Sequence, residues 1–163
     1  MTTAHLHLLT IHAPLTLAPL AFLFLAWVEL TGRTNLRRLA LGLSVLAGLA
    51  FLPPYLTGEG AEDVVKALPG VTKGLIHEHE EAAEIALVLG LLSAALAGAQ
   101  LIWPALEKRR GLARLPVLAL GLTSGAAAIT GQRGGQIRRP ELRGTSAVSI
   151  DEPPASDSGE SDE

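Results

Sequence analysis

The sequence has no cysteine, few aromatic residues and little charge. The absence of cysteine excludes disulfides, thiolate zinc sites, cysteine-ligated iron–sulfur clusters and a cysteine nucleophile. Charged residues make up 18% of the 163 positions and aromatic residues 4%, whereas a typical soluble domain has about 25% charged residues. A chain of this length needs a polar surface around its small core, so an ordinary soluble domain is disfavoured.

The charge that is present avoids four long stretches of the chain. Runs of 18 to 22 residues carry no formal charge; they are 8–28, 39–58, 85–106 and 115–132. Each is close to the roughly 20 residues that an α-helix needs to cross a bilayer core. We therefore predict an all-α, polytopic membrane protein with the lipid bilayer as its partner. It is a four-transmembrane-helix bundle within residues 1–143, with spans of about 8–30, 39–57, 82–106 and 113–132.

Proline and glycine predict where these helices bend and end. Pro14 and Pro19 should kink the first helix, the Pro53-Pro54 pair should bend the second near its end, and Gly134-Gly135 should end the fourth. Between the second and third spans, apolar residues within 64–68 share one face, which predicts a short interfacial helix lying at the headgroups. Residues 144–163 are rich in Ser, Pro and acids, and we expect an acidic disordered tail.

The basic residues predict an orientation. Seven lysines and arginines lie within 33–38 and 108–114, the connections that join the first helix to the second and the third to the fourth. Six others lie at 66, 73 and within 133–143. Because cytoplasmic loops are enriched in Lys and Arg, we expect both termini on the outer side. The basic residues are not gathered on one helix, so no nucleic-acid partner is expected.

In a bundle of four spans, the start of the first and third helices lies on the same side as the end of the second and fourth. The polar residues at these ends should therefore form one polar layer on the outer side. The layer contains all five histidines of the chain and several acids. Its members are His5, His7, His12, Glu59, Glu62, His77, Glu78, His79, Glu80, Glu81, Glu84, Gln132 and Arg133.

One stripe of this layer runs along the third span. His77, Glu80, Glu81 and Glu84 have the i, i+3, i+4, i+7 spacing of a single helix face. Glu84 is the deepest of them, and an ionisable group near hydrocarbon needs a partner. We predict Arg133, at the end of the fourth span, as that partner.

Three interpretations of the polar layer stay open. It is a structural cap; or it binds haem b or a metal ion through His12 with His77 or His79, because imidazole suits iron, zinc and copper; or it belongs to a proton or ion pathway. Neither H-E-x-x-H nor E-x-x-H supports a metal site, and no charged residue continues through the membrane centre. A P-loop and G-x-S-x-G are also missing, so we expect no catalysis and no obligatory cofactor.

Small residues recur at four-residue spacing on three of the spans. This spacing lets helix backbones approach closely in lipid, within the bundle or against a partner, although membrane helices are also rich in small residues by composition. The residues are Ala40, Ser44 and Gly48, then Gly90, Ala94 and Gly98, then Gly121 and Gly125.

The chain resembles an uncharacterised family of small four-helix bacterial membrane proteins, domain of unknown function 2231. The resemblance lies in I-H-A-P at 11–14, Y-L-T-G-E-G-A-E-D-V-V at 55–65, L-P-G-V at 68–71, H-E-E-A-A-E at 79–84 and G-G-Q-I-R-R-P-E at 134–141. It implies a polytopic bundle with an outer polar layer and no known reaction. Family members tend to carry histidine where this chain has Gln132 and Arg139, which favours a structural role over a redox one.

Together these features predict a non-catalytic, multi-pass protein of the bacterial inner membrane with both termini in the periplasm. We expect an accessory or stabilising subunit of a larger membrane complex, of the respiratory or photosynthetic electron-transfer kind. The alternatives are a b-type haem or metal-binding redox protein that uses His12, His77 and His79, and an ion or proton carrier.

Overall fold

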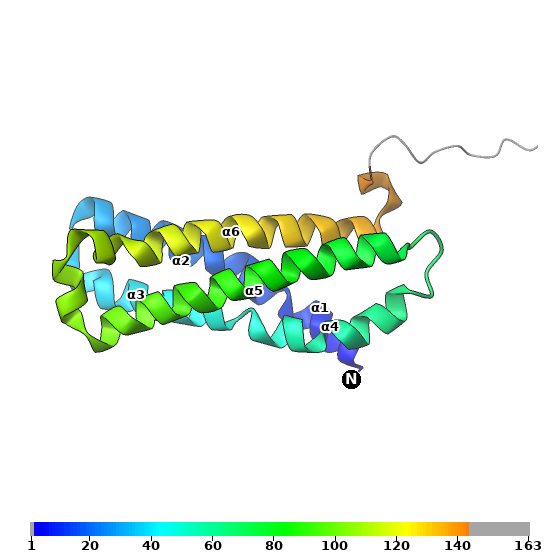
Figure 1. The fold of residues 1–163 in the computed structure, drawn as a ribbon, viewed down its shortest axis with the longest axis horizontal. Coiled ribbons are helices and arrows are strands. Elements are labelled where there is room, and N and C mark those ends of the chain that lie inside the picture. Colours follow the sequence, from blue (N-terminus) through cyan, green and yellow to red (C-terminus); the bar gives the residue numbers. More distant parts are fainter. Residues whose placement is uncertain (1, 144–163) are drawn as a thin grey trace, which may run out of the picture.

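The computed structural model describes residues 2–143, with the exception of the Arg110 side chain, and these residues are helical with short connections (Figure 1). The predicted acidic tail, 144–163, lies outside the described residues. The elements are α1 (Thr3–Thr10), α2 (His12–Thr31), α3 (Thr34–Leu49), α4 (Leu52–Val65), α5 (Lys73–Ile102) and α6 (Arg110–Arg138), with the 3₁₀ turns η1 (Pro104–Lys108) and η2 (Pro140–Leu142).

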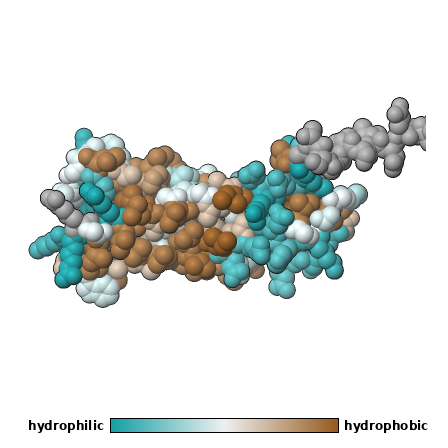
Figure 2. Space-filling model, turned by 45° about the horizontal axis from the view of Figure 1, so that its top comes forward, coloured by the Kyte–Doolittle hydropathy of each residue, from teal (hydrophilic) through white to brown (hydrophobic). Residues whose placement is uncertain are grey.

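Four helical segments are long enough and apolar enough to cross a membrane. They are Thr3–Thr31, Thr34–Val65, Lys73–Ile102 and Gly111–Arg138. Figure 2 shows apolar surface over the middle of the molecule and polar surface at both ends. The all-α architecture with four candidate spans is therefore confirmed.

Two of these segments are broken just before their prolines. Proline has no N–H to donate to the carbonyl four residues earlier, so Pro14 leaves Thr10 and Pro54 leaves Ala50 without that bond. The breaks lie at Ile11, between α1 and α2, and at Ala50–Phe51, between α3 and α4. The helix is thus interrupted near Pro14 and near the Pro53-Pro54 pair, as predicted, whereas α2 runs through Pro19 without a break.

The predicted boundary between the second span and the short helix that follows it is wrong, whereas the position of that helix at the headgroups stays a prediction. The helix that begins at Leu52 continues without interruption to Val65, as α4, and α1 packs along it. One glycine makes this packing close: a Cβ on Gly60 would overlap the Thr3 side chain, whereas a Cβ on Gly58 would make an ordinary contact with His7. Contact with α1 thus holds the 52–65 segment as a helix of the bundle, which outweighs the low helix propensity of glycine.

The prediction that Gly134-Gly135 ends the fourth helix is also wrong, because α6 runs on to Arg138. A Cβ on Gly134 would lie 3.0 Å from the His79 ring, and one on Gly135 would lie 3.4 Å from Leu142. These glycines allow the side chains of His79 and Leu142 to approach the backbone of α6, and they do not form a turn.

The long helices form a ring in which α2 packs against α3, α3 against α5, α5 against α6, and α6 again against α2. Leu25, Leu41 and Leu120 are fully buried in its core among alanines. The backbones of α3 and α5 approach closely, since a Cβ on Gly48 would overlap the carbonyl of Gly90. Small residues of the predicted spacing are therefore used inside the bundle.

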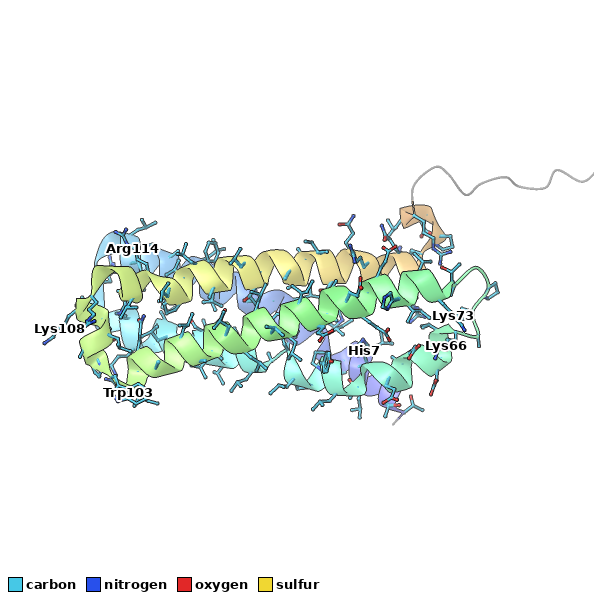
Figure 3. All side chains as sticks on the ribbon, viewed as in Figure 1. His7, Lys66, Lys73, Trp103, Lys108 and Arg114 are labelled. Atoms are coloured by element: carbon cyan, nitrogen blue, oxygen red, sulfur yellow. The ribbon has the colours of Figure 1, made fainter. Side chains whose placement is uncertain are left out.

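The two ends of the bundle are built differently. At one end, which we call the histidine end, the start of α1 lies beside α4 and the start of α5 beside the end of α6, while the two pairs touch each other little (Figure 1). At the opposite end, which we call the Arg37 end, the connections between helices close the ring. In Figure 3, Lys66 and Lys73 mark the histidine end, and Lys108 and Arg114 mark the Arg37 end.

Candidate functional site

The polar layer predicted from the four spans lies at the histidine end. His5 and His7 lie on α1, His12 begins α2, and His77 and His79 lie in the first two turns of α5. Thr72 caps that helix by accepting a hydrogen bond from the N–H of Leu75.

Most of the predicted site residues lie on the surface of this end. Of the three predicted histidine ligands, His12 and His77 are exposed and His79 is half-buried. His77 Nε2 lies 3.3 Å from the Glu81 carboxylate, one turn along α5. Among the other members of the predicted cluster, Glu59, Glu80, Glu81, Glu84 and Gln132 are exposed, and Glu62 and Arg133 are half-buried.

A cleft of mixed charge lies between α4 and α5. Lys66 Nζ is 2.8 Å from Glu62 at its wall, and this hydrogen bond raises the pKa of Lys66 above its usual value. The lining residues are Glu62, Lys66, Lys73, Ile76, His77 and Glu80. Two acids face two lysines, so the cleft presents no strong field of either sign to a charged ligand.

The predicted pair between Glu84 and Arg133 is wrong. Arg133 Nη1 donates to the backbone carbonyl of Glu78 at 2.7 Å, and the Glu84 side chain is exposed. Glu84 lies six residues further along α5 than Glu78, which is about 9 Å by the helix rise. The two side chains are therefore at different depths in the bundle.

Two histidines are held differently from the rest. His7 Nδ1 lies 2.8 Å from the carbonyl of Pro54 on α4, and His79 Nδ1 lies 3.1 Å from the carbonyl of Thr130 on α6. Both rings are half-buried. Sequence reasoning named His79 as a candidate ligand but missed His7. No residue pattern could have found it, because the partner of its ring is a backbone carbonyl on another helix.

The described residues of this end do not form a metal centre with three or more protein ligands. Within residues 2–143, no three or more side chains of His, Asp or Glu gather in an arrangement that could hold a metal ion. The histidine end therefore offers ligands in pairs at most.

The Arg37 end contains a buried ionic cluster that sequence reasoning missed. Arg37 is 9% exposed; its Nη2 donates to Gln100 Oε1 at 2.7 Å and to the carbonyl of Ala113 at 3.1 Å. Its guanidinium also pairs with Glu29 on α2 and, at 3.5 Å, with Glu107 on η1. One side chain thus ties α3 to α2, α5, η1 and α6.

Gln100 extends this cluster by donating to the carbonyl of Leu112 at 2.7 Å. From the sequence alone, Arg37 is one of the basic residues that predict the orientation. The available signal was Glu29 and Gln100, polar residues close to the ends of apolar runs, which need partners when buried. Because the Arg37 guanidinium contacts four other elements of the bundle, we assign the cluster to holding the helices together.

Comparison with known proteins adds no relative. No protein-family model matches the chain, and no curated protein and no solved structure matches it significantly. The resemblance to the uncharacterised four-helix family stays a prediction.

Proposed function

We propose that this protein is a non-catalytic integral membrane protein that acts as an accessory or stabilising subunit of a larger membrane complex. The four apolar helices and the polar ends support insertion into a bilayer as a multi-pass protein. The bundle interior is filled by small and aliphatic side chains brought into close contact, as at Gly48 and Gly90. This filling supports a packing role better than passage of ions through the bundle.

The observation that carries the accessory role is an outward notch on α6. Leu118, Leu122 and Ile129 are exposed on the outer face of this helix. Gly125 lies between them, and a Cβ added there would have nothing within 4 Å. An outward small residue flanked by larger apolar ones lets a second helix approach closely in lipid.

Affinity purification of the full chain in a mild detergent tests this role. We expect one or more membrane proteins to co-purify in a fixed ratio, and Gly125→Leu to lower their recovery at least fivefold because leucine fills the notch. Gly42→Leu is the matched control, since Gly42 on α3 also faces open space, and it should leave recovery unchanged. A stable monomer without a co-purifying protein would contradict the accessory role.

We further propose that the protein lies in the bacterial inner membrane with the Arg37 end in the cytoplasm and both termini in the periplasm. Seven of the basic residues lie in or within a few residues of the connections at the Arg37 end, and cytoplasmic loops are enriched in such residues.

Reporter fusions test the orientation. We expect alkaline phosphatase fused after residue 143 to be active and a fluorescent protein fused there to be dark. The same reporters inserted at residues 108–109 should give the opposite result. Active phosphatase at 108–109 would show that the orientation is reversed.

A further inference from the structure

We propose that α1 and α4 form one hinged unit whose movement opens and closes the cleft between α4 and α5. The unit turns about the two helix breaks, at Ile11 and at Ala50–Phe51, while the rest of the bundle stays in place. The proposal stands apart from the accessory role, because it concerns the histidine end and not the outer face of α6.

The two helix breaks lie at the same level of the bundle. The helix α1 packs along α4, and α2 packs along α3, so the break between α1 and α2 faces the break between α3 and α4. At each break a proline removes a backbone hydrogen bond, and helices bend most readily at such positions. Hinges are formed by a few residues at the ends of rigid elements. Two facing breaks therefore define one axis about which α1 and α4 can turn.

Contacts inside the proposed unit are close. A Cβ on Gly60 of α4 would overlap the Thr3 side chain at the start of α1. About one turn further along α1, His7 Nδ1 lies 2.8 Å from the carbonyl of Pro54, at the other end of α4. The contact between the two helices thus extends along both of them, and we infer that they move as one body.

Contacts between this unit and the rest of the bundle are few. The helix α1 contains no buried residue, and α4 buries only Pro54. Among the groups that the structure describes within 2–143, no hydrogen bond or ion pair joins α1 or α4 to α5 or α6. Moving the unit away from α5 therefore exposes little apolar surface and breaks no polar contact between them. Regions with few buried contacts are those that open at low cost in free energy.

The charged cleft lies on the seam between the moving and the fixed parts. Glu62 and Lys66 line it from the side of α4, and Lys73, Ile76, His77 and Glu80 line it from α5. Figure 3 shows Lys66 and Lys73 on the two sides of the connection that joins these helices. Because the two walls belong to different bodies, movement of the α1–α4 unit changes the width of the cleft.

The connection between α4 and α5 allows this movement but limits it. Residues 66–70 form turns rather than extended chain, and a chain in turns can lengthen towards about 3.3–3.6 Å per residue. Arg143 Nη1 donates to the carbonyl of Gly70 at 2.6 Å and so fastens the far side of the connection beyond the end of α6. The unit is thus hinged at the breaks and tethered at its other end.

Distances between pairs of spin labels on the full chain, in lipid nanodiscs, test the proposal. The chain has no cysteine, so introduced cysteines carry the labels without background. We place them at exposed positions as Leu9→Cys on α1, Asp63→Cys on α4, Glu78→Cys on α5 and Arg138→Cys on α6. The pair 63–78 crosses the seam, whereas 9–63 and 78–138 lie within one helix pair each.

We expect the distance distribution of the 63–78 pair to be at least twice as wide as that of either internal pair. A 63–78 distribution as narrow as both internal ones would overturn the proposal, because the cleft would then have a single width. A 9–63 distribution as wide as that of 63–78 would also overturn it, because α1 and α4 would then move separately.

Proline variants test the position of the hinge. Pro14→Ala combined with Pro54→Ala supplies the missing donors to the carbonyls of Thr10 and Ala50, so both helices should become continuous and the 63–78 distribution should narrow to the width of the internal pairs. Pro19→Ala is the control, because α2 runs through Pro19 without a break, and it should leave the distribution unchanged. Elution volume and circular dichroism establish that each variant is folded. An unchanged 63–78 distribution in the folded double variant would overturn the hinge at these breaks.

Discussion

Replacing Arg37 by methionine should lower the free energy of unfolding by about 3 kcal/mol, at the lower end of the range for breaking a buried ion pair. Methionine is similar in length but cannot donate. Glu29 and Glu107 would then share a partly buried region without a cation, and Gln100 Oε1 and the Ala113 carbonyl would lose their donor. Thermal or denaturant unfolding in mild detergent measures the loss. The two tryptophans, Trp27 and Trp103, report on this end of the bundle through their fluorescence.

The neighbouring Arg38 is the matched control, because it is an exposed arginine on the same helix. Arg38→Met should change stability by no more than about 0.5 kcal/mol. Adding Glu29→Gln and Glu107→Gln to Arg37→Met should recover part of the loss, since the unpaired charges disappear. Equal stabilities of the Arg37 and Arg38 variants would show that the cluster does not hold the helices together.

Gly48→Ala should lower the free energy of unfolding by about 2–3 kcal/mol, the cost typical of overpacking. The added Cβ would overlap the carbonyl of Gly90 and lie 2.8 Å from the Cβ of Ala94. The nearest obstacle is backbone rather than a flexible side chain, so relief requires α3 and α5 to move apart. The same unfolding assay measures this effect.

Gly42→Ala provides the comparison on the same helix. Nothing lies within 4 Å of its added Cβ, and alanine has the higher helix propensity, so this variant should be at least as stable as the parent. If Gly48→Ala were equally stable, the close approach of α3 to α5 would not be a source of stability.

The sequence predicts the long helices well because absence of charge over some 20 residues is a strong signal that does not depend on neighbours. The number of spans likewise predicts correctly that the histidines lie at one end of the bundle. The predicted end of the fourth helix at Gly134 was wrong. Gly134 leaves space for the His79 ring of α5, and the helix continues despite the low helix propensity of glycine. The boundary predicted between the second span and the short helix after it failed because α4 begins at Leu52 and packs closely against α1 at Gly60.

The candidate site was harder to predict, because partners in three dimensions decide it. Periodicity places His77 and His79 on different faces of α5 but cannot show that a carbonyl on α6 orients the His79 ring. His7 is one of several histidines of the predicted polar layer, and only the packing of α1 on α4 shows that its ring meets the carbonyl of Pro54. In the sequence, Arg37 resembles any other basic residue of a connection. Only the structure shows that Glu29, Gln100 and the carbonyl of Ala113 surround its guanidinium.

The ring order of the helices also bears on how the chain is assembled during synthesis. The helix α2 packs against both α3 and α6, so an early and a late part of the chain are neighbours. During translation α2, α3 and α5 emerge first, and the ring stays open until residues 110–138 follow. The carbonyls of Leu112 and Ala113, which accept from Gln100 and Arg37, arrive with that same helix. Closure of the ring and completion of the Arg37 cluster are therefore one late event, and a chain that stops before α6 lacks both.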